Sequence, residues 1–156
     1  MAVDVQTEVV IARPRHEVAA YATEPANAPH WYANIHSARW RTDPPVRVGS
    51  SIDFVARFLG RRLAYTYEVV ELVPGERLVM RTEHGPFPME TTYTWQAIDA
   101  MSTRMTLRNR GEPAGFSRMT GTAMAAAMRR ANKKDLAALK QLLEAATDDL
   151  DTDTAS

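Results

Sequence analysis

The sequence predicts an α+β fold in which a curved, seven-stranded antiparallel sheet wraps around a long C-terminal helix. Two observations predict it. Seven short segments have strand-like apolar patterns, and the last six follow one another with only tight turns between them, which is typical of an antiparallel meander. From about residue 116 to residue 146 the apolar period lengthens to that of a helix. One apolar face of the sheet must be covered, and only this helix, roughly 40 Å long at ~1.5 Å per residue, is long enough.

The N-terminal elements are expected to be one strand and two short helices. Val3–Ile11 alternates apolar and polar residues, the period of a half-buried strand. Pro14 follows at a position suited to the first turn of a short helix, which we expect to reach Ala22. A second short helix or turn is expected over Ala26–Tyr32. The two short helices therefore separate the first strand from the second.

Six further strands are predicted, each closed by residues that favour turns. They are expected at Ile35–Thr42, Ser50–Leu59, Arg61–Val73, Arg77–Glu83, Met89–Ile98 and Thr103–Arg110.

The long helix is expected over about Phe116–Ala146, although Gly121 leaves its start open. Its apolar stripe is formed by Met124, Met128, Leu136, Leu139 and Leu143. The segment that follows is acidic and has almost no apolar residues, a composition that does not support a packed core. We therefore expect one domain over residues 1–146 and a disordered acidic tail over residues 147–156.

Composition excludes several classes of protein. The chain has 156 residues with no cysteine, which excludes disulfides, thiolate metal sites and a cysteine nucleophile. Its 19 basic and 19 acidic residues give no net charge, which argues against a nucleic-acid partner. No apolar run approaches the ~20 residues of a membrane span, and the first residues lack the pattern of a secretion signal. We expect a cytoplasmic protein that does not insert into membranes.

Strand parity predicts an inner face that is aromatic, rich in methionine and dotted with hydroxyls, while most charged side chains point outward. The early half of the helix carries small, flexible or polar residues such as Gly121, Ala125 and Asn132, which leave space against the sheet. We therefore expect a ligand cavity there, although large sheet aromatics could instead fill this room. The expected ligand-binding residues are Trp40, Phe54, Phe58, Tyr65, Tyr67, Met80, Thr82, Met89, Thr91, Tyr93, Trp95, Met105, Asn109, Met124 and Met128.

A pocket of the usual ~300–1,000 Å³ cannot stay dry and empty, because the void would cost as much as a whole domain's stability. Water held by polar groups, or a resident ligand, must fill it.

Catalytic residues stay open, with two histidines and two tyrosines as candidates. His84 lies in a turn near the expected pocket mouth and could act as acid or base near neutral pH, but it could equally be an exposed turn residue. His36 has inner parity and could contact a ligand carbonyl, or could be a buried histidine with its hydrogen bonds satisfied. Tyr67 and Tyr93 can stack on an apolar ligand and still donate a hydrogen bond.

No metal and no cofactor are expected. His30 and His36 are six residues apart, which fits no helical pair of ligands, and no carboxylate shares their predicted face. Motifs of nucleotide binding and of serine hydrolases are missing, and no carboxylate pair is predicted on the inner face for glycosidase chemistry.

Four stretches carry a resemblance to a known family over about residues 3–146. They read EVVIARPRHEVAAYATEPANAPHWY, YTYEVVELVPGERLVMRTEHGPFP, YTWQAIDAMSTRMTLRNRG and MRRANKKDLAALKQLLEA. In element order and turn positions the chain resembles the SRPBCC superfamily, the START and birch-pollen-allergen helix-grip fold, in its polyketide cyclase/dehydrase-like branch. One departure is the hairpin at residues 99–102, which lacks the glycine-rich turn often found there.

The resemblance implies a helix-grip fold and a hydrophobic small-molecule ligand, with no catalytic set to carry over. The first hypothesis is a protein that binds an aromatic or polyketide- or lipid-like molecule between sheet and helix. The second is an enzyme of the polyketide cyclase, aromatase or dehydratase type that uses the pocket tyrosines and histidines. A third is a toxin–antitoxin-type or ribosome-associated helix-grip protein, against which the neutral charge speaks. Ligand identity and oligomeric state stay open, with a homodimer as one option.

Overall fold

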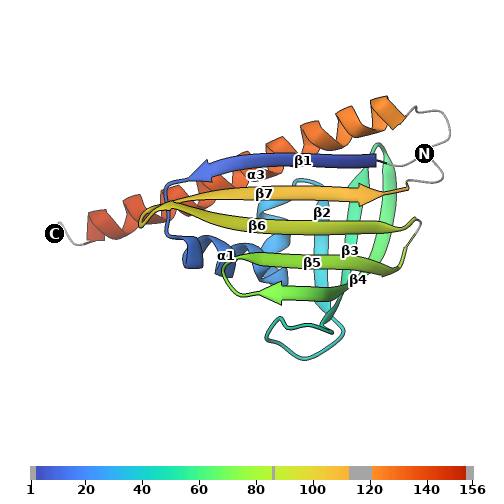
Figure 1. The fold of residues 1–156 in the computed structure, drawn as a ribbon, viewed down its shortest axis with the longest axis horizontal. Helices are drawn as coiled ribbons and strands as arrows, with labels where there is room; N and C mark the ends of the chain where they lie inside the picture. Colours follow the sequence, from blue (N-terminus) through green and yellow to red (C-terminus); the bar gives the residue numbers. More distant parts are fainter. Residues whose placement is uncertain (1–2, 86, 113–120, 154–156) are drawn as a thin grey trace.

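A seven-stranded antiparallel sheet curves around one long helix (Figure 1). The structure, a computed structural model, describes residues 3–85, 87–112 and 121–153, and for residues 83 and 146–153 it describes the backbone alone. In chain order the elements are β1 (Val3–Ile11), α1 (Arg15–Thr23), the 3-10 helix η1 (Pro25–Asn27), α2 (Ala28–Trp31), β2 (Ile35–Trp40), β3 (Ser51–Phe58), β4 (Arg61–Val73), β5 (Arg77–His84), β6 (Met89–Asp99), β7 (Ser102–Gly111) and α3 (Gly121–Asp153).

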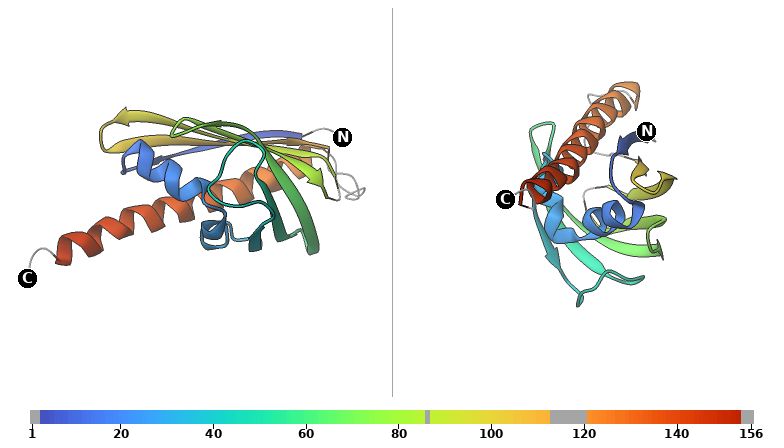
Figure 2. Two further views of the ribbon diagram at one scale, coloured as in Figure 1. Left: turned by 90° about the horizontal axis from the view of Figure 1, so that it is seen from below. Right: turned by 90° about the vertical axis from the view of Figure 1, so that its left-hand side faces the viewer.

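The order of strands across the sheet is β1-β7-β6-β5-β4-β3-β2. The first strand therefore pairs with the last one, with Val3 opposite Gly111 and Ile11 opposite Thr103. The second strand lies at the far edge, so α1, η1 and α2 carry the chain from one edge of the sheet to the other. They lie on the same side of the sheet as α3 (Figure 2).

The predicted fold class is confirmed, and the predicted strands agree with the observed ones within a few residues. The expected start of the long helix near Phe116 lies outside the described residues. At its other end, the backbone of α3 continues to Asp153, well into the segment expected to be a disordered tail. No glycine or proline between residues 147 and 153 forces the helix to end earlier. The boundary of the domain stays a prediction.

The interior is divided into two apolar clusters along α3. The larger cluster lies under the later half of the helix, where Leu136, Leu139 and Leu143 pack among buried side chains that include Trp95 and Met105. The smaller cluster lies at the early half and consists of Val3, Val5, Leu63, Phe87, Met124 and Met128. The later half of the helix thus fills a tight core, as its leucines predict.

The connection between β5 and β6 packs closely against the sheet. A Cβ atom added to Gly85 would lie 2.6 Å from Cδ1 of Tyr65, and one added to Gly111 would overlap the carbonyl oxygen of Pro88. Only a residue without a side chain fits at either position. This close packing positions Phe87, which is 7% exposed and contacts the ring of Tyr65 edge to face.

Charged side chains lie on the outer face of the sheet and pair across neighbouring strands. Arg108 donates two hydrogen bonds to Asp4, and Arg81 donates one to Glu90. Among the described residues, no helix is long and apolar enough to cross a membrane.

Candidate functional site

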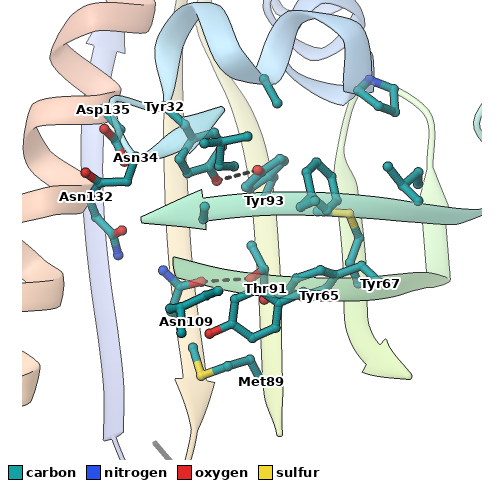
Figure 3. A pocket seen from close by; sticks show the side chains of 18 of the residues that line it. Tyr32, Asn34, Tyr65, Tyr67, Met89, Thr91, Tyr93, Asn109, Asn132 and Asp135 are labelled. Atoms are coloured by element: carbon teal, nitrogen blue, oxygen red, sulfur yellow. Dashed lines mark hydrogen bonds between the residues drawn. The ribbon is translucent and has the colours of Figure 1, made fainter. Parts of the chain in front are cut away.

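A cavity of about 180 Å³ lies between the early half of α3 and the inner face of the sheet (Figure 3). Its walls come from α1, η1, the α2–β2 connection, the strands β2 to β7, and α3. The volume lies below the ~300–1,000 Å³ of most ligand pockets, so the cavity as it stands suits a small ring-containing molecule rather than a long chain.

Most of the residues expected to contact a ligand do line this cavity. They are Phe54, Phe58, Tyr65, Tyr67, Met80, Met89, Thr91, Tyr93, Asn109, Met124 and Met128.

Four residues of the predicted set lie elsewhere. Trp95 and Met105 are buried in the larger core cluster, and Trp40 packs against that cluster from β2. The hydroxyl of Thr82 accepts a hydrogen bond from the backbone N–H of Met89, at 3.0 Å, and the residue borders a surface groove instead. Strand parity identifies the correct face, but it does not say how far along the strand the cavity extends.

None of the four histidines belongs to the described residues that line the cavity. His36 was predicted on the inner face, and this prediction was wrong. A β-bulge between Ile35 and Ser37 shifts the register, so that His36 is exposed and Ile35 lines the cavity instead. His84 ends β5 and is exposed, which is the alternative that its turn sequence left open.

The polar groups of the cavity gather where α3 meets the α2–β2 connection. The hydroxyls of Tyr32 and Tyr93 share a hydrogen bond, and the backbone N–H of Ala33 donates to Oδ1 of Asp135 at 3.0 Å (Figure 3). Asn132 lies one turn before Asp135 on the same wall, and its Nδ2 is buried with no hydrogen-bond partner among the described residues. We call Tyr32, Tyr93, Asn132 and Asp135 the polar corner.

A second polar contact lies at the opposite end of the cavity, next to Tyr65 and Met89 (Figure 3). There the hydroxyl of Thr91 donates to Oδ1 of Asn109 at 2.8 Å.

Burial shifts the ionisation of the cavity groups. Asp135 is 3% exposed, and its burial raises the pKa of the carboxyl from 3.8 to about 6, although the hydrogen bond from Ala33 and the charge of Lys134 oppose the shift. Burial raises the pKa of Tyr67 to about 12 and also raises the pKa of Tyr93. At neutral pH the tyrosines are therefore protonated donors, whereas Asp135 can gain or lose a proton.

Sequence reasoning missed Asp135 and Tyr32. Asp135 lies between Met128 and Leu136 at the helical spacing of the apolar stripe, so an ionisable residue inside that stripe was the available signal. Tyr32 lies just after a helix of four residues, where no period is long enough to show which way a side chain points.

The lining carries charge of one sign. Among the described residues of the cavity wall, the acidic side chains are Glu24 and Asp135, and there is no lysine, arginine or histidine. Glu24 uses one oxygen to accept from the N–H of Ala26 at 3.3 Å. No group of three or more histidine, aspartate or glutamate residues in the described ranges is arranged to hold a metal ion.

A family model described as polyketide cyclase / dehydrase and lipid transport matches residues 2–144. No curated protein matches the sequence.

Solved structures share the fold at low sequence identity. A START superfamily protein from Mycobacterium smegmatis superimposes with a TM-score of 0.76 and 14% identity over 90% of this chain and 97% of its own. The Zhui aromatase/cyclase from a Streptomyces species superimposes with a TM-score of 0.76 and 16% identity, over 92% of this chain and 94% of its own. A major latex-like protein from Panax ginseng superimposes with a TM-score of 0.65 and 13% identity, over 85% of this chain and 94% of its own. At these identities the similarity shows the fold alone.

Proposed function

Since the chain belongs to the polyketide cyclase / dehydrase and lipid transport family, we propose that it binds a hydrophobic small molecule with an aromatic ring in the cavity between sheet and helix. The observation that carries the proposal is the composition of the cavity wall. Apolar side chains provide most of it, with aromatic rings and methionines among them, and the polar groups are few and lie mainly at its two ends. This combination is typical of a pocket that holds an apolar body and orients it by one or two hydrogen bonds.

Energetics also favour an occupant. A dry void of 180 Å³ would cost about 4 kcal/mol at ~24 cal/mol per Å³, a large part of a domain's ~5–15 kcal/mol of stability. A ligand that fills the space removes this cost and is therefore expected to stabilise the fold.

The test measures the binding of 1-naphthol, a neutral two-ring probe, from the change in its fluorescence. Ala131 lines the cavity from α3, so Ala131→Leu puts a larger side chain into the space that the probe would occupy. Ala137→Leu adds the same side chain on the exposed face of the same helix. We expect Ala131→Leu to weaken binding at least tenfold and Ala137→Leu to leave it unchanged. Equal binding by the two variants would place the probe outside the cavity and contradict the proposal.

A second candidate function is an enzyme of the polyketide cyclase or dehydratase type. Tyr67 and Tyr93 both line the cavity as protonated donors, which suits them to hold a substrate carbonyl, and Asp135 supplies a group able to accept a proton near neutral pH. His36 and His84 lie outside the lining. For cyclisation of a short poly-β-ketone we therefore expect Tyr93→Phe to lose most of the rate. Unchanged turnover in Tyr93→Phe, or its loss in the double variant His36→Ala, His84→Ala, would contradict this assignment.

We also propose that the protein is cytoplasmic. A homodimer is a further option, and sedimentation of the purified protein would distinguish it from a monomer.

A further inference from the structure

The described cavity wall has acidic side chains and no basic one, and the positive charge that acts on Asp135 comes from Lys134, which does not line the cavity. Asp135 is the more deeply placed of its two carboxylates, at 3% exposed, while Glu24 is half-buried near the start of η1. Burying a carboxylate without a counter-charge is costly. The raised pKa of Asp135 reflects this cost, which a bound cation would remove.

One polar atom in the corner is buried without a hydrogen-bond partner among the described residues, Nδ2 of Asn132, and it lies close to Asp135, whose Oδ1 accepts from the backbone N–H of Ala33. Asn132 is 5% exposed, lies three residues earlier on the same helix face, and has an unpartnered Nδ2. Figure 3 shows both side chains reaching from α3 toward the cavity. In native proteins such groups are normally paired with protein, water or a ligand, so the corner has the features of a binding site rather than of packed core.

Two tyrosines of the cavity wall, Tyr32 and Tyr93, lie close enough to the carboxylate of Asp135 for its charge to raise the pKa of both. The hydrogen bond from Ala33 holds Asp135 beside Tyr32, whose ring centroid lies 4.0 Å from that of Trp31. The ring of Tyr93 lies 5.8 Å from Trp31, and its hydroxyl meets that of Tyr32. A carboxylate near two tyrosine rings is a suitable environment for an organic cation, because aromatic faces attract positive charge as well as apolar surface.

We propose that the polar corner selects a small aromatic ligand that carries a protonated amine, with the ammonium group donating to Asp135 and the ring lying in the apolar part of the cavity. This inference rests on the proposed function and names its ligand class. By the same charge argument, a molecule that ends in a carboxylate is rejected, because it would bring like charges together in a space of low dielectric constant.

The test compares three probes of similar shape: 2-phenylethylamine, 2-phenylethanol and 3-phenylpropionate, each titrated by calorimetry near pH 7.5. In the wild-type protein we expect the amine to bind at least tenfold more tightly than the alcohol, and the carboxylate to bind more weakly than both. In Asp135→Asn, which keeps the shape and the acceptor for Ala33, the amine should lose this preference and the alcohol should bind within about twofold of wild type. Asp4→Asn on the outer face is the matched control and should change nothing.

Acid gives a second readout on the wild-type protein. The groups that face Asp135 are Tyr32 and the N–H of Ala33 from the α2–β2 connection, Tyr93 from β6, and Lys134 on its own helix. Only Asp135 among them is expected to gain a proton between about pH 7 and pH 5, and the amine stays charged throughout. The preference for the amine over the alcohol should therefore fall over this range.

The outcomes separate this inference from the proposed function. If the alcohol binds and the amine shows no preference, or if the preference survives in Asp135→Asn, the amine inference is overturned and binding of aromatic molecules stands. If none of the three probes binds the wild-type protein, both are overturned. A thermal melt of each variant confirms that it is folded before titration.

Discussion

Asp135 carries a charge at a position where the apolar stripe of α3 would otherwise place a leucine. Its neighbours on that stripe, Leu136 and Leu139, are fully buried and contribute to the core. Replacing them by a carboxylate would only destabilise the fold, whereas Asp135 lines a cavity and accepts a backbone hydrogen bond. A polar residue that costs stability and faces a cavity is a typical signature of a functional position.

The pH dependence of stability measures this cost. The pKa of Asp135 is raised to about 6 in the folded protein from 3.8, so the folded state holds an extra proton between about pH 4 and pH 6. The contribution of Asp135 to stability therefore falls as pH rises through this window and is constant above it. We expect Asp135→Asn to be more stable than wild type above pH 6, on the order of 2–3 kcal/mol, and equally stable below pH 4. Urea denaturation at several pH values measures the difference.

Two other carboxyls have pKa values that are lowered in the folded protein. Their effect on stability is the same in wild type and in Asp135→Asn, so it cancels when the two proteins are compared. The hydrogen bond from Arg108 lowers the pKa of Asp4, and the one from Lys140 lowers the pKa of Glu144, so both proteins lose this stability as pH falls. A gap between wild type and Asp135→Asn that does not change between pH 4 and pH 7 would show that Asp135 is not buried as described.

At the scale of elements, α3 does two jobs with its two halves. Its later half packs Leu136, Leu139 and Leu143 into the larger core cluster, and its early half presents Met124, Met128 and smaller residues to the cavity. The early half therefore leaves room for a ligand, while the later half supplies the packing that keeps the helix on the sheet.

Truncation of two leucines in α3 tests this division. Leu139 is 0% exposed, so Leu139→Ala should cost about 2–5 kcal/mol, as for other fully buried leucines. Leu142 is 40% exposed on the same helix, and Leu142→Ala should cost less than about 1 kcal/mol. Both values come from chemical denaturation. A similar loss of unfolding free energy in the two variants would mean that α3 does not pack against the sheet through the face that carries Leu139.

The elements were largely predictable from the sequence, and the site only in part. Alternation along strands such as β6 and the helical stripe of α3 depend on local periods, which a sequence displays directly. The bulge that turns His36 outward depends on how β2 pairs with β3, and no period records that pairing. Ala33, next to Tyr32, and Asp135 meet across 102 residues of chain, a contact that only the folded molecule shows.

At the scale of the whole molecule, the neutral net charge is the sum of two different surfaces. Positive and negative side chains pair on the outer face of the sheet, while the described wall of the cavity carries only acidic charge. The outer pairs are exposed, with Arg108 at 39% and Asp4 at 51%, so water screens them and each contributes little to stability.

Salt should therefore affect the fold weakly. Raising sodium chloride from about 0.05 M to about 0.5 M shortens the Debye length severalfold and weakens the outer pairs. Since these pairs contribute little, we expect the free energy of unfolding to change by less than about 1 kcal/mol. Thermal melts at the two salt concentrations provide the measurement. A loss of several kcal/mol would show that the arginine and carboxylate pairs of the outer face hold the sheet together.

The pairing of β1 with β7 has a consequence for folding during synthesis. β1 is made before the other strands of this sheet, yet the strand with which it pairs, β7, lies about 100 residues later in the chain. At about 5–20 residues per second of synthesis, the alternating apolar residues of β1 wait on the order of 5–20 s for a partner. β1 can join the sheet only after β7 has been made, so a nascent chain that stops before β7 carries an unpaired β1 and leaves one edge of β6 unpaired, and such edges promote aggregation.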